Sequence, residues 1–154
     1  PKPGILFRDI TPLLRSHFGA AMDALDGLFD AAEWAATDAV AGVESRGFIL
    51  AAALAERHRK GFVPIRKKGK LPPPVVDRSY ELEYGSGVLE MQRGSGQLLL
   101  IDDVLATGGT LAASAALAVD AGFQVDRLGV LIDLGLAAEF RWQGQPARTV
   151  IRYG

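Results

Sequence analysis

The chain has 154 residues, of which 49% are apolar, and its 17 basic and 18 acidic side chains give a formal net charge of −1. This length and composition are typical of one folded domain and exclude a disordered chain. The near balance of charge argues against a protein that coats nucleic acid or an anionic membrane. The absence of cysteine excludes disulfides, thiolate metal sites and thiol catalysis.

Composition also bears on location. Without cysteine we expect a reducing, cytoplasmic compartment. No apolar run approaches the roughly 20 residues of a membrane-spanning helix, and we expect no signal peptide, because a basic start followed by an apolar segment is missing. The chain begins Pro1-Lys2-Pro3-Gly4 without methionine, so we expect that an N-terminal element of the natural protein is missing.

The first predicted elements are a helix, a strand and a second helix. Residues 18–36 predict a helix whose apolar side comprises Ala20, Leu25, Leu28 and Phe29. Residues 38–44 form a short apolar run that ends in an acid, which is typical of a buried strand. Residues 47–60 predict a helix that closes on a run of cations, with Gly61 as its stop.

The middle of the chain departs from this alternation. Residues 62–66 have a strand pattern that Pro64 would restrict to a sheet edge. Residues 69–79 contain Pro72-Pro73-Pro74, which predicts an exposed loop. Residues 80–91 alternate apolar and polar side chains around Gly85-Ser86-Gly87, which predicts a hairpin with a glycine turn.

The last third returns to strand and helix. Residues 98–103 and 129–133 predict buried strands that end in acids, and residues 110–121 predict a helix that stops at Gly122. Strands and helices alternating in this order favour an α/β fold with a doubly wound, mostly parallel sheet. Ligands of such sheets bind beyond the carboxyl ends of the strands. A long loop inserted there is more often a functional lid than a segment without function.

The end of the 98–103 strand carries the strongest chemical signal. Two carboxylates, Asp102 and Asp103, are followed by a run of small and hydroxyl residues at a predicted helix start. That run is Ala106, Thr107, Gly108, Gly109 and Thr110. Small residues let backbone N–H groups face a ligand, and a helix N-terminus attracts anions, so the segment predicts a phosphate cradle.

Neighbouring carboxylates repel a bare phosphate. They suit a ligand that presents hydroxyls or a divalent cation beside its phosphate, as a ribose 5-phosphate does. A purely structural alternative is that the acids cap the helix and the glycines turn the chain, but the whole combination favours a binding site. The segment has neither the Gly-Lys-Ser/Thr of a P-loop nor the three-glycine dinucleotide fingerprint.

This segment resembles the signature of the type I phosphoribosyltransferases, which bind 5-phosphoribosyl 1-pyrophosphate (PRPP). Residues 3–12, 44–48, 65–72 and 80–85 narrow the resemblance to the adenine phosphoribosyltransferases. It implies a single domain over residues 1–154 with the sheet of that family, an inserted flexible loop and a β-hairpin. It also implies a hood made of residues 1–12 and 133–145.

The resemblance implies a role for each motif. The acids Asp102 and Asp103 would hold the ribose hydroxyls, and residues 106–110 would hold the 5-phosphate. The residues at the pyrophosphate would be Glu44, Ser45, Arg46, Lys67 and Lys70, the lysines reaching it in the same or the neighbouring subunit. In this family the turn at 44–47 can contain a non-proline cis peptide. The adenine contacts would be Leu6, Phe7, Arg8 and Leu134, and the catalytic residues would be Glu83, Arg46 and Tyr84.

The implied reaction joins adenine to PRPP and gives AMP and pyrophosphate in purine salvage. The resemblance further implies a homodimer and Mg²⁺ carried by PRPP, with no direct protein ligand. Alternatives are another purine or orotate phosphoribosyltransferase, a PRPP-binding regulator without catalysis, and a Rossmann-like oxidoreductase. The basic residues within 57–70 could mark a nucleic-acid patch, but Phe62 is the only aromatic among them. We expect neither a nucleic-acid nor a membrane partner.

Overall fold

The structure is a computed structural model, and it describes residues 9–82 and 85–153. Its helices are α2 (Thr11–Asp26), α3 (Ala31–Ala36), α4 (Arg46–His58) and α5 (Gly109–Asp120). Its strands are β1 (Ala39–Val43), β2 (Gly61–Lys67), β3 (Val75–Leu82), β4 (Gly85–Gln92), β5 (Gly96–Leu105), β6 (Phe123–Asp133) and β7 (Arg148–Arg152). None of the helices in these two ranges is long and apolar enough to cross a membrane.

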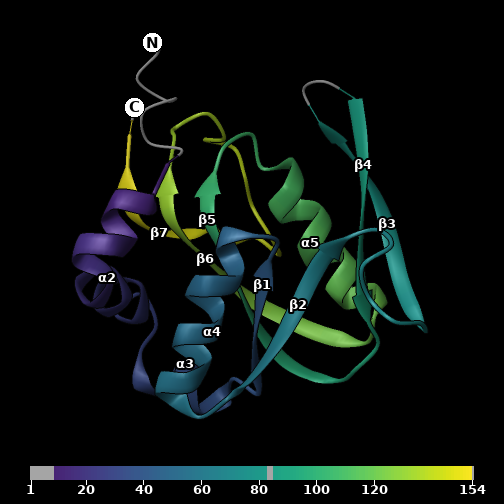
Figure 1. Ribbon diagram of the computed structural model, residues 1–154, viewed down its shortest axis with the longest axis horizontal. Helices are drawn as coiled ribbons and strands as arrows, with labels where there is room; N and C mark the ends of the chain where they lie inside the picture. The colour runs from purple at the N-terminus through teal and green to yellow at the C-terminus, as the bar shows by residue number, and fades with distance from the viewer. Residues whose placement is uncertain (1–8, 83–84, 154) are drawn as a thin grey trace.

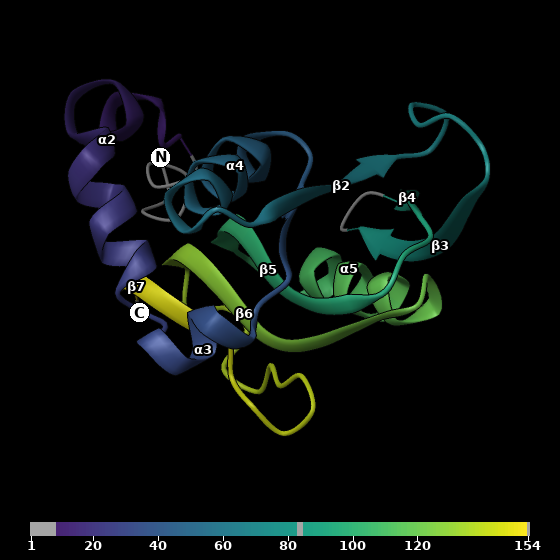
Figure 2. The same cartoon turned by 90° about the horizontal axis from the view of Figure 1, so that it is seen from below.

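The described strands form one sheet in the order β3-β4-β2-β1-β5-β6-β7 (Figure 1). Strands β2, β1, β5, β6 and β7 pair in parallel, whereas β4 pairs antiparallel with both β3 and β2. Figure 2 shows α2 and α4 together, and α5 on the side of the β3–β4 hairpin. The predicted α/β fold with a mostly parallel sheet is therefore confirmed.

Strand β5 lies inside the sheet, between β1 and β6, and is buried on both faces. Leu98 and Leu100 pack in the hydrophobic layer that includes α5, and Leu99 and Ile101 pack in the layer that includes α2 and α4. Successive side chains of a strand point to opposite faces, so one apolar run serves two cores. The same buried run of the strand continues through Asp102 and Asp103, which places two acids at its end.

Helix α4 lies unusually close to the sheet. A Cβ atom at Gly42 would lie 2.7 Å from the carbonyl oxygen of Gly47 and 2.8 Å from the Cβ of Ala51. Such distances are shorter than carbon atoms tolerate, so the glycine is required for the close approach of β1 and α4. The approach brings the start of α4 against the acid end of β5.

The predicted helix over residues 18–36 is wrong in its bounds. Helix α2 ends at Asp26, and a separate helix α3 begins after Asp30. The Asp30 carboxylate accepts the Glu33 N–H at 2.8 Å, and the Glu33 carboxylate accepts the Asp30 N–H at 2.9 Å. This capping box starts a new helix and overrides the continuous apolar periodicity. Of the predicted apolar side, Ala20 is exposed, while the other members are buried or half-buried.

The predicted helix stops differ in outcome. Gly122 follows α5 with a φ of +111°, as expected of a glycine stop. Gly61 does not stop α4, because Arg59 takes the left-handed conformation with a φ of 56° and Gly61 already belongs to β2. The Lys60 N–H then donates to the Ala55 carbonyl at 2.9 Å, which closes the helix without a glycine.

The predicted hairpin is confirmed, but its glycines are not in the turn. Gly85 and Gly87 belong to β4 and pair with Leu82 and Tyr80. A Cβ at Gly87 would lie 2.9 Å from the Tyr80 ring, so this glycine makes room for the ring. The predicted edge position of the strand with Pro64 is wrong, because β2 lies between β4 and β1 in the sheet. The proline is tolerated because, in the described part of the chain, β4 pairs with β2 only at Arg66 and Lys67, beyond Pro64.

Candidate active site

The described site residues gather at one edge of the sheet. The carboxyl ends of β5 and β6 point to the same edge, beside the N-terminus of α5 (Figure 1). Glu44 directly follows β1, and Asp102 and Asp103 lie near the end of β5. This is the edge at which open α/β sheets bind ligands, and it unites motifs that are far apart in sequence.

The acid pair, Asp102 and Asp103, is almost fully buried, with 8% and 7% of each residue exposed. The Asp102 carboxylate accepts the backbone N–H of Asp103 at 2.8 Å. Burial, and then the neighbouring charge of Asp103, raise the pKa of Asp102 well above its ordinary value. Asp103 has a cation beside it, since its Oδ2 lies 2.8 Å from Nε of Arg46. The two acids therefore have unequal environments.

The glycine at the start of α4 allows this arrangement. A Cβ at Gly47 would lie 3.0 Å from Oδ1 of Asp102 and 3.3 Å from the carbonyl oxygen of Ile101. Arg46 is the first residue of α4 and is therefore held next to the acid pair. The Glu44–Ser45 peptide is cis, as the family resemblance implies for this turn.

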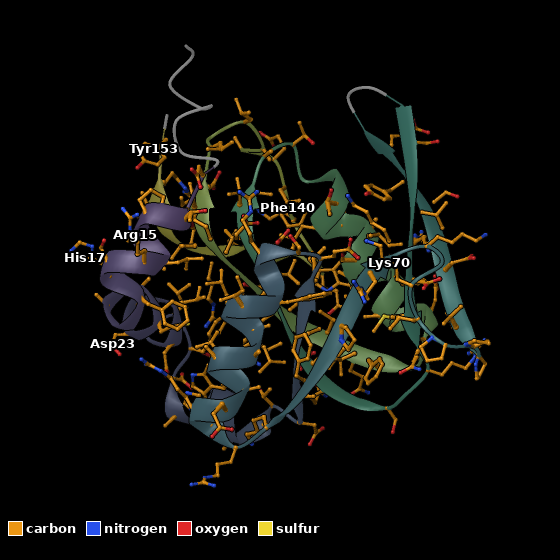
Figure 3. All side chains as sticks on the ribbon, viewed as in Figure 1. Arg15, His17, Asp23, Lys70, Phe140 and Tyr153 are labelled. Atoms are coloured by element: carbon orange, nitrogen blue, oxygen red, sulfur yellow. The ribbon has the colours of Figure 1, made fainter. Side chains whose placement is uncertain are left out.

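The 106–110 segment connects the acid pair to α5. Gly108 caps the helix with a φ of +95°, and a Cβ there would lie 2.8 Å from Cδ2 of Phe140. A Cβ at Gly109 would lie 3.3 Å from the carbonyl oxygen of Glu81 in the hairpin. The segment is thus enclosed by Phe140 on one side, labelled in Figure 3, and by the hairpin on another.

A cavity of about 100 Å³ lies at this segment. Its lining is Asp102, Val104, Leu105, Ala106, Thr107, Gly108, Thr110 and Leu111. One of the predicted ribose residues, Asp102, therefore shares a hollow with four of the five predicted phosphate residues, while Asp103 and Gly109 are not among the lining residues. A larger cavity, about 400 Å³, lies beyond β6 and includes Asp133, Phe140 and Arg152 among its lining residues. Phe140 thus belongs to the surroundings of both the segment and the larger cavity.

The side chain of Glu44 gathers basic groups. Its carboxylate accepts the Lys67 N–H at 3.1 Å and Nε–H of Arg66 at 3.3 Å, and it contacts the ammonium of Lys70. Burial raises the pKa of Glu44, but the bonds from Lys70, Lys67 and Arg66 outweigh it, so the pKa lies below its ordinary value. Glu44 is consequently an organiser of cations as well as a member of the predicted pyrophosphate turn.

Sequence reasoning missed Glu90 of β4. Only 3% of this residue is exposed, and its carboxylate accepts N–H groups from Gly69, Lys70 and Leu71 at 3.0, 2.9 and 2.7 Å. The available signal was an acid between the apolar residues Leu89 and Met91. A charge in that position needs a partner, and the glycine-containing loop before β3 supplies it.

The remaining predicted residues divide into two groups. Leu134 follows β6, is 6% exposed and donates its N–H to the Leu105 carbonyl at 3.0 Å. The others, Leu6, Phe7, Arg8, Glu83 and Tyr84, lie outside the described residues. Within 9–82 and 85–153, no three His, Cys, Asp or Glu side chains gather as a metal site would require.

Comparison with known proteins gives the class to which this geometry belongs. The family model described as "Phosphoribosyl transferase domain" matches residues 18–143. The match includes the acid pair, the 106–110 segment, the 44–47 turn and the hairpin. The chain belongs to the phosphoribosyltransferase family, and the sheet, with its carboxyl-end site, is the framework on which these motifs meet.

The similar proteins are more specific. An adenine phosphoribosyltransferase of Hydrogenovibrio crunogenus is 51% identical over 154 residues, covering 99% of this chain and 90% of the relative. That of Bdellovibrio bacteriovorus is 44% identical over 153 residues, covering 99% and 92%. The crystal structure of adenine phosphoribosyltransferase from Rhodothermus marinus has a TM-score of 0.82 and 41% identity, covering 94% of this chain and 85% of that one. The predicted resemblance to adenine phosphoribosyltransferases is confirmed.

Proposed function

We propose that the protein transfers the 5-phosphoribosyl group of PRPP to N9 of adenine, and so forms AMP and pyrophosphate in purine salvage. The bond from C1 of the ribose to the pyrophosphate oxygen breaks, and the bond from C1 to N9 forms as N9 loses its proton. The observation that carries the proposal is the buried acid pair beside the 106–110 segment, with Arg46 on Asp103. The adenine phosphoribosyltransferase relatives support adenine as the base.

The sugar end of PRPP fits the acid pair and the segment after it. Carboxylates of Asp102 and Asp103 accept hydrogen bonds from the ribose 2- and 3-hydroxyls. Backbone N–H groups and the hydroxyls of Thr107 and Thr110 bind the 5-phosphate at the positive end of α5. The left-handed Gly108 supports this assignment, because it allows the backbone to turn its N–H groups toward an anion.

The pyrophosphate end fits the turn at 44–47. Arg46 supplies a guanidinium that can bind two phosphate oxygens, and Lys67 and Lys70 supply further positive charge. Ser45 contributes its hydroxyl and backbone. The leaving group gains negative charge as the C1–O bond breaks, so fixed cations lower the barrier by stabilising that charge.

We assign the base and the lid as the family resemblance implies. Adenine stacks on Phe7 under the hood of residues 1–12 and 133–145, with Leu134 on its other face. The backbone groups of Leu6 and Arg8 read the purine edge. Glu83 and Tyr84 are assigned to the lid over C1. The position of the hairpin supports this, since a Cβ at Gly109 would lie 3.3 Å from the carbonyl oxygen of Glu81.

Mg²⁺ fits the proposal as an ion that arrives with PRPP. Magnesium takes oxygen ligands, keeps several waters and is bound chiefly through substrate phosphates. Among the described residues, the carboxylates of the acid pair are assigned to the ribose hydroxyls, and that of Glu44 already binds Lys67, Arg66 and Lys70. When bound, the ion supplies neutralising charge at the pyrophosphate, and Arg46 and the lysines add to it.

We propose a cytoplasmic homodimer without nucleic-acid or membrane partners. An apolar patch of α4 and β2 supports the dimer: Ile49 and Phe62 are 46% and 38% exposed, and the Phe48 ring packs edge-on to Phe62 at a centroid distance of 5.7 Å. Exposed apolar surface of this kind marks protein interfaces. Light scattering during gel filtration, with Phe62→Ser as the variant, tests this assignment.

The enzymatic test is the formation of AMP from adenine and PRPP, measured with and without Mg²⁺. We expect equal amounts of AMP and pyrophosphate, and turnover that depends on the metal. Hypoxanthine, guanine, xanthine and orotate should be poor acceptors. Preference for one of these bases would replace adenine as the substrate, and PRPP binding without pyrophosphate release would identify a regulator instead.

A further inference from the structure

A buried carboxylate holds the loop between β2 and β3, residues 68–74, which we call the lysine loop. Glu90 projects from β4 between the buried residues Leu89 and Met91. Its two oxygens accept three successive backbone N–H groups, those of Gly69 at 3.0 Å, Lys70 at 2.9 Å and Leu71 at 2.7 Å. Three adjacent amides that point at one anion form a nest, the same device by which loops bind phosphate.

The nest depends on the conformation of Gly69. Its φ is +93°, which turns its N–H toward the same point as the next two amides. A Cβ at this position would meet nothing within 4 Å, so the requirement for glycine is conformational and not steric. Hydrogen bonds from Gly69 and Leu71 hold the pKa of Glu90 below its ordinary value, which keeps the anion in the nest charged.

Other contacts of the lysine loop lie at its two ends: the Lys68 N–H donates to the Val88 carbonyl at 3.0 Å, and the Pro72 carbonyl accepts from Nε2 of Gln92 at 3.3 Å. All of residues 68–74 except Leu71 are exposed, and three of them are prolines, which cannot donate backbone hydrogen bonds. At the far end of the Lys70 side chain, the ammonium contacts Glu44, next to the 44–47 turn. Lys70, which is labelled in Figure 3, is therefore fixed at both ends, its backbone by Glu90 and its ammonium by Glu44.

We infer that Glu90 is a positioning residue, which holds the lysine loop so that the Lys70 ammonium stays at the pyrophosphate end of the site. The inference rests on the proposed function. Glu90 itself is buried behind the loop and acts on the substrate only through Lys70. The reason is entropic: a loop without this anchor must be ordered each time PRPP binds, and that cost lowers the affinity.

The test compares Glu90→Gln, Lys70→Gln and the double variant in the complete protein. Glutamine keeps the shape of the side chain but loses the charge, and its amide N–H₂ group opposes the N–H donors of the nest. We expect Glu90→Gln to raise KM for PRPP about tenfold, since hydrogen bonds to charged groups contribute on this scale. KM for adenine should change less than twofold. In the Lys70→Gln background, Glu90→Gln should have no further effect on KM for PRPP.

The matched control is Asp77→Asn, which removes a carboxylate that faces the same loop from the surface. Oδ2 of Asp77 lies 3.5 Å from Nζ of Lys68, and both side chains are about half exposed or more. This variant should leave both KM values unchanged. The inference is overturned if Glu90→Gln leaves KM for PRPP unchanged, or raises it equally with and without Lys70. A purely structural role would lower stability without this dependence on Lys70.

A second measurement needs no variant and no activity. In the wild-type protein, hydrogen exchange at the amides of Gly69, Lys70 and Leu71 should be slowed at least tenfold relative to an unstructured loop. Unprotected exchange at all three would contradict the anchor even if Glu90→Gln proved impossible to fold. Absence of AMP formation by the wild-type protein would instead refute the proposed function, while the exchange result still decides whether Glu90 anchors the loop.

Discussion

Replacing Asp103 by asparagine separates the stability of the site from its chemistry. The change preserves the shape of the side chain and removes the charge that lies 2.8 Å from Nε of Arg46. Breaking a fully buried ion pair costs about 3–5 kcal/mol, whereas exposed pairs contribute about 0–1 kcal/mol. The Asp103 side chain is 9% exposed but that of Arg46 is 44% exposed. We therefore expect Asp103→Asn to lower the free energy of unfolding by only about 1 kcal/mol.

A second effect works in the opposite direction. The charge of Asp103 is one cause of the raised pKa of Asp102, so Asp103→Asn removes a repulsion between two buried carboxyls. The pKa of Asp102 should fall in the variant, and this relief offsets part of the lost ion pair. Urea unfolding at pH 7 measures the net change, with a small shift of the midpoint as the expected result.

Activity should respond much more strongly. If Asp103 accepts hydrogen bonds from ribose hydroxyls, each such bond to a charged acceptor contributes about 1.5–3 kcal/mol. Loss of about 3 kcal/mol corresponds to a decrease of roughly 150-fold in kcat/KM. The assay varies PRPP at saturating adenine and follows pyrophosphate release.

Asp23→Asn is the matched control. Asp23 also pairs with an arginine at 2.8 Å, through Nη1 of Arg57, but on the surface of α2 and α4. That variant should keep wild-type kcat/KM for PRPP. The reasoning on the acid pair is refuted if Asp103→Asn also retains wild-type kcat/KM. A loss of stability above about 3 kcal/mol would show instead that the ion pair serves the fold.

Two further predictions concern acid stability and the 106–110 segment. Glu33 has a pKa lowered to about 2, chiefly by its hydrogen bonds from Arg148. Its contribution to the free energy of unfolding is therefore fully present above pH 4.5 and is lost as the pH falls toward 2. Glu33→Gln should remove on the order of 2 kcal/mol of stability at pH 7 and flatten the decrease between pH 5 and 2, as measured by denaturation across pH. Gly108→Ala should raise KM for PRPP at least tenfold, because a Cβ there meets both a φ of +95° and the Phe140 ring. The control is Gly19→Ala, in open space on α2, which should leave kinetics unchanged and raise the free energy of unfolding by about 0.5–1 kcal/mol. Equal KM values for PRPP in Gly108→Ala and Gly19→Ala would contradict the role of Gly108.

The strands and helices that carry the site could be predicted because local signals agree with tertiary burial. Continuous apolar runs around 98–103 and 129–133 are strands buried on both faces, and Gly122 stops α5 as its sequence position indicates. The boundary between α2 and α3 could not be read from periodicity, because the capping box at Asp30 interrupts a pattern that remains apolar. Arg59 was missed as a helix stop because a non-glycine residue rarely takes the left-handed conformation.

The site itself could be predicted at the level of motifs and not of contacts. The acid pair and the segment after it could be predicted, since residue types and their order alone indicate a phosphate cradle beside carboxylates. The pairing of Arg46 with Asp103 depends on how closely α4 approaches β5. Gly47 permits this approach, but the distance between the two elements is a property of the fold and cannot be read from the sequence. The sequence marks Glu90 as an acid between two apolar residues, but its partners could not be predicted, because they are backbone amides some 20 residues away and such amides have no sequence signature.

The alternation of β5 between two hydrophobic layers has a consequence for the tolerance of this stretch to insertions and deletions. Losing one residue between Leu98 and Ile101 would turn the strand residues on one side of the deletion to the opposite face of the sheet, so that their aliphatic side chains would meet the wrong core. The same shift would move a carboxylate by one position into the apolar core, where burying a charge is unfavourable. Packing in both hydrophobic layers therefore fixes the number of residues in this stretch. The positions of the two acids are set by side chains that do not contact the substrate.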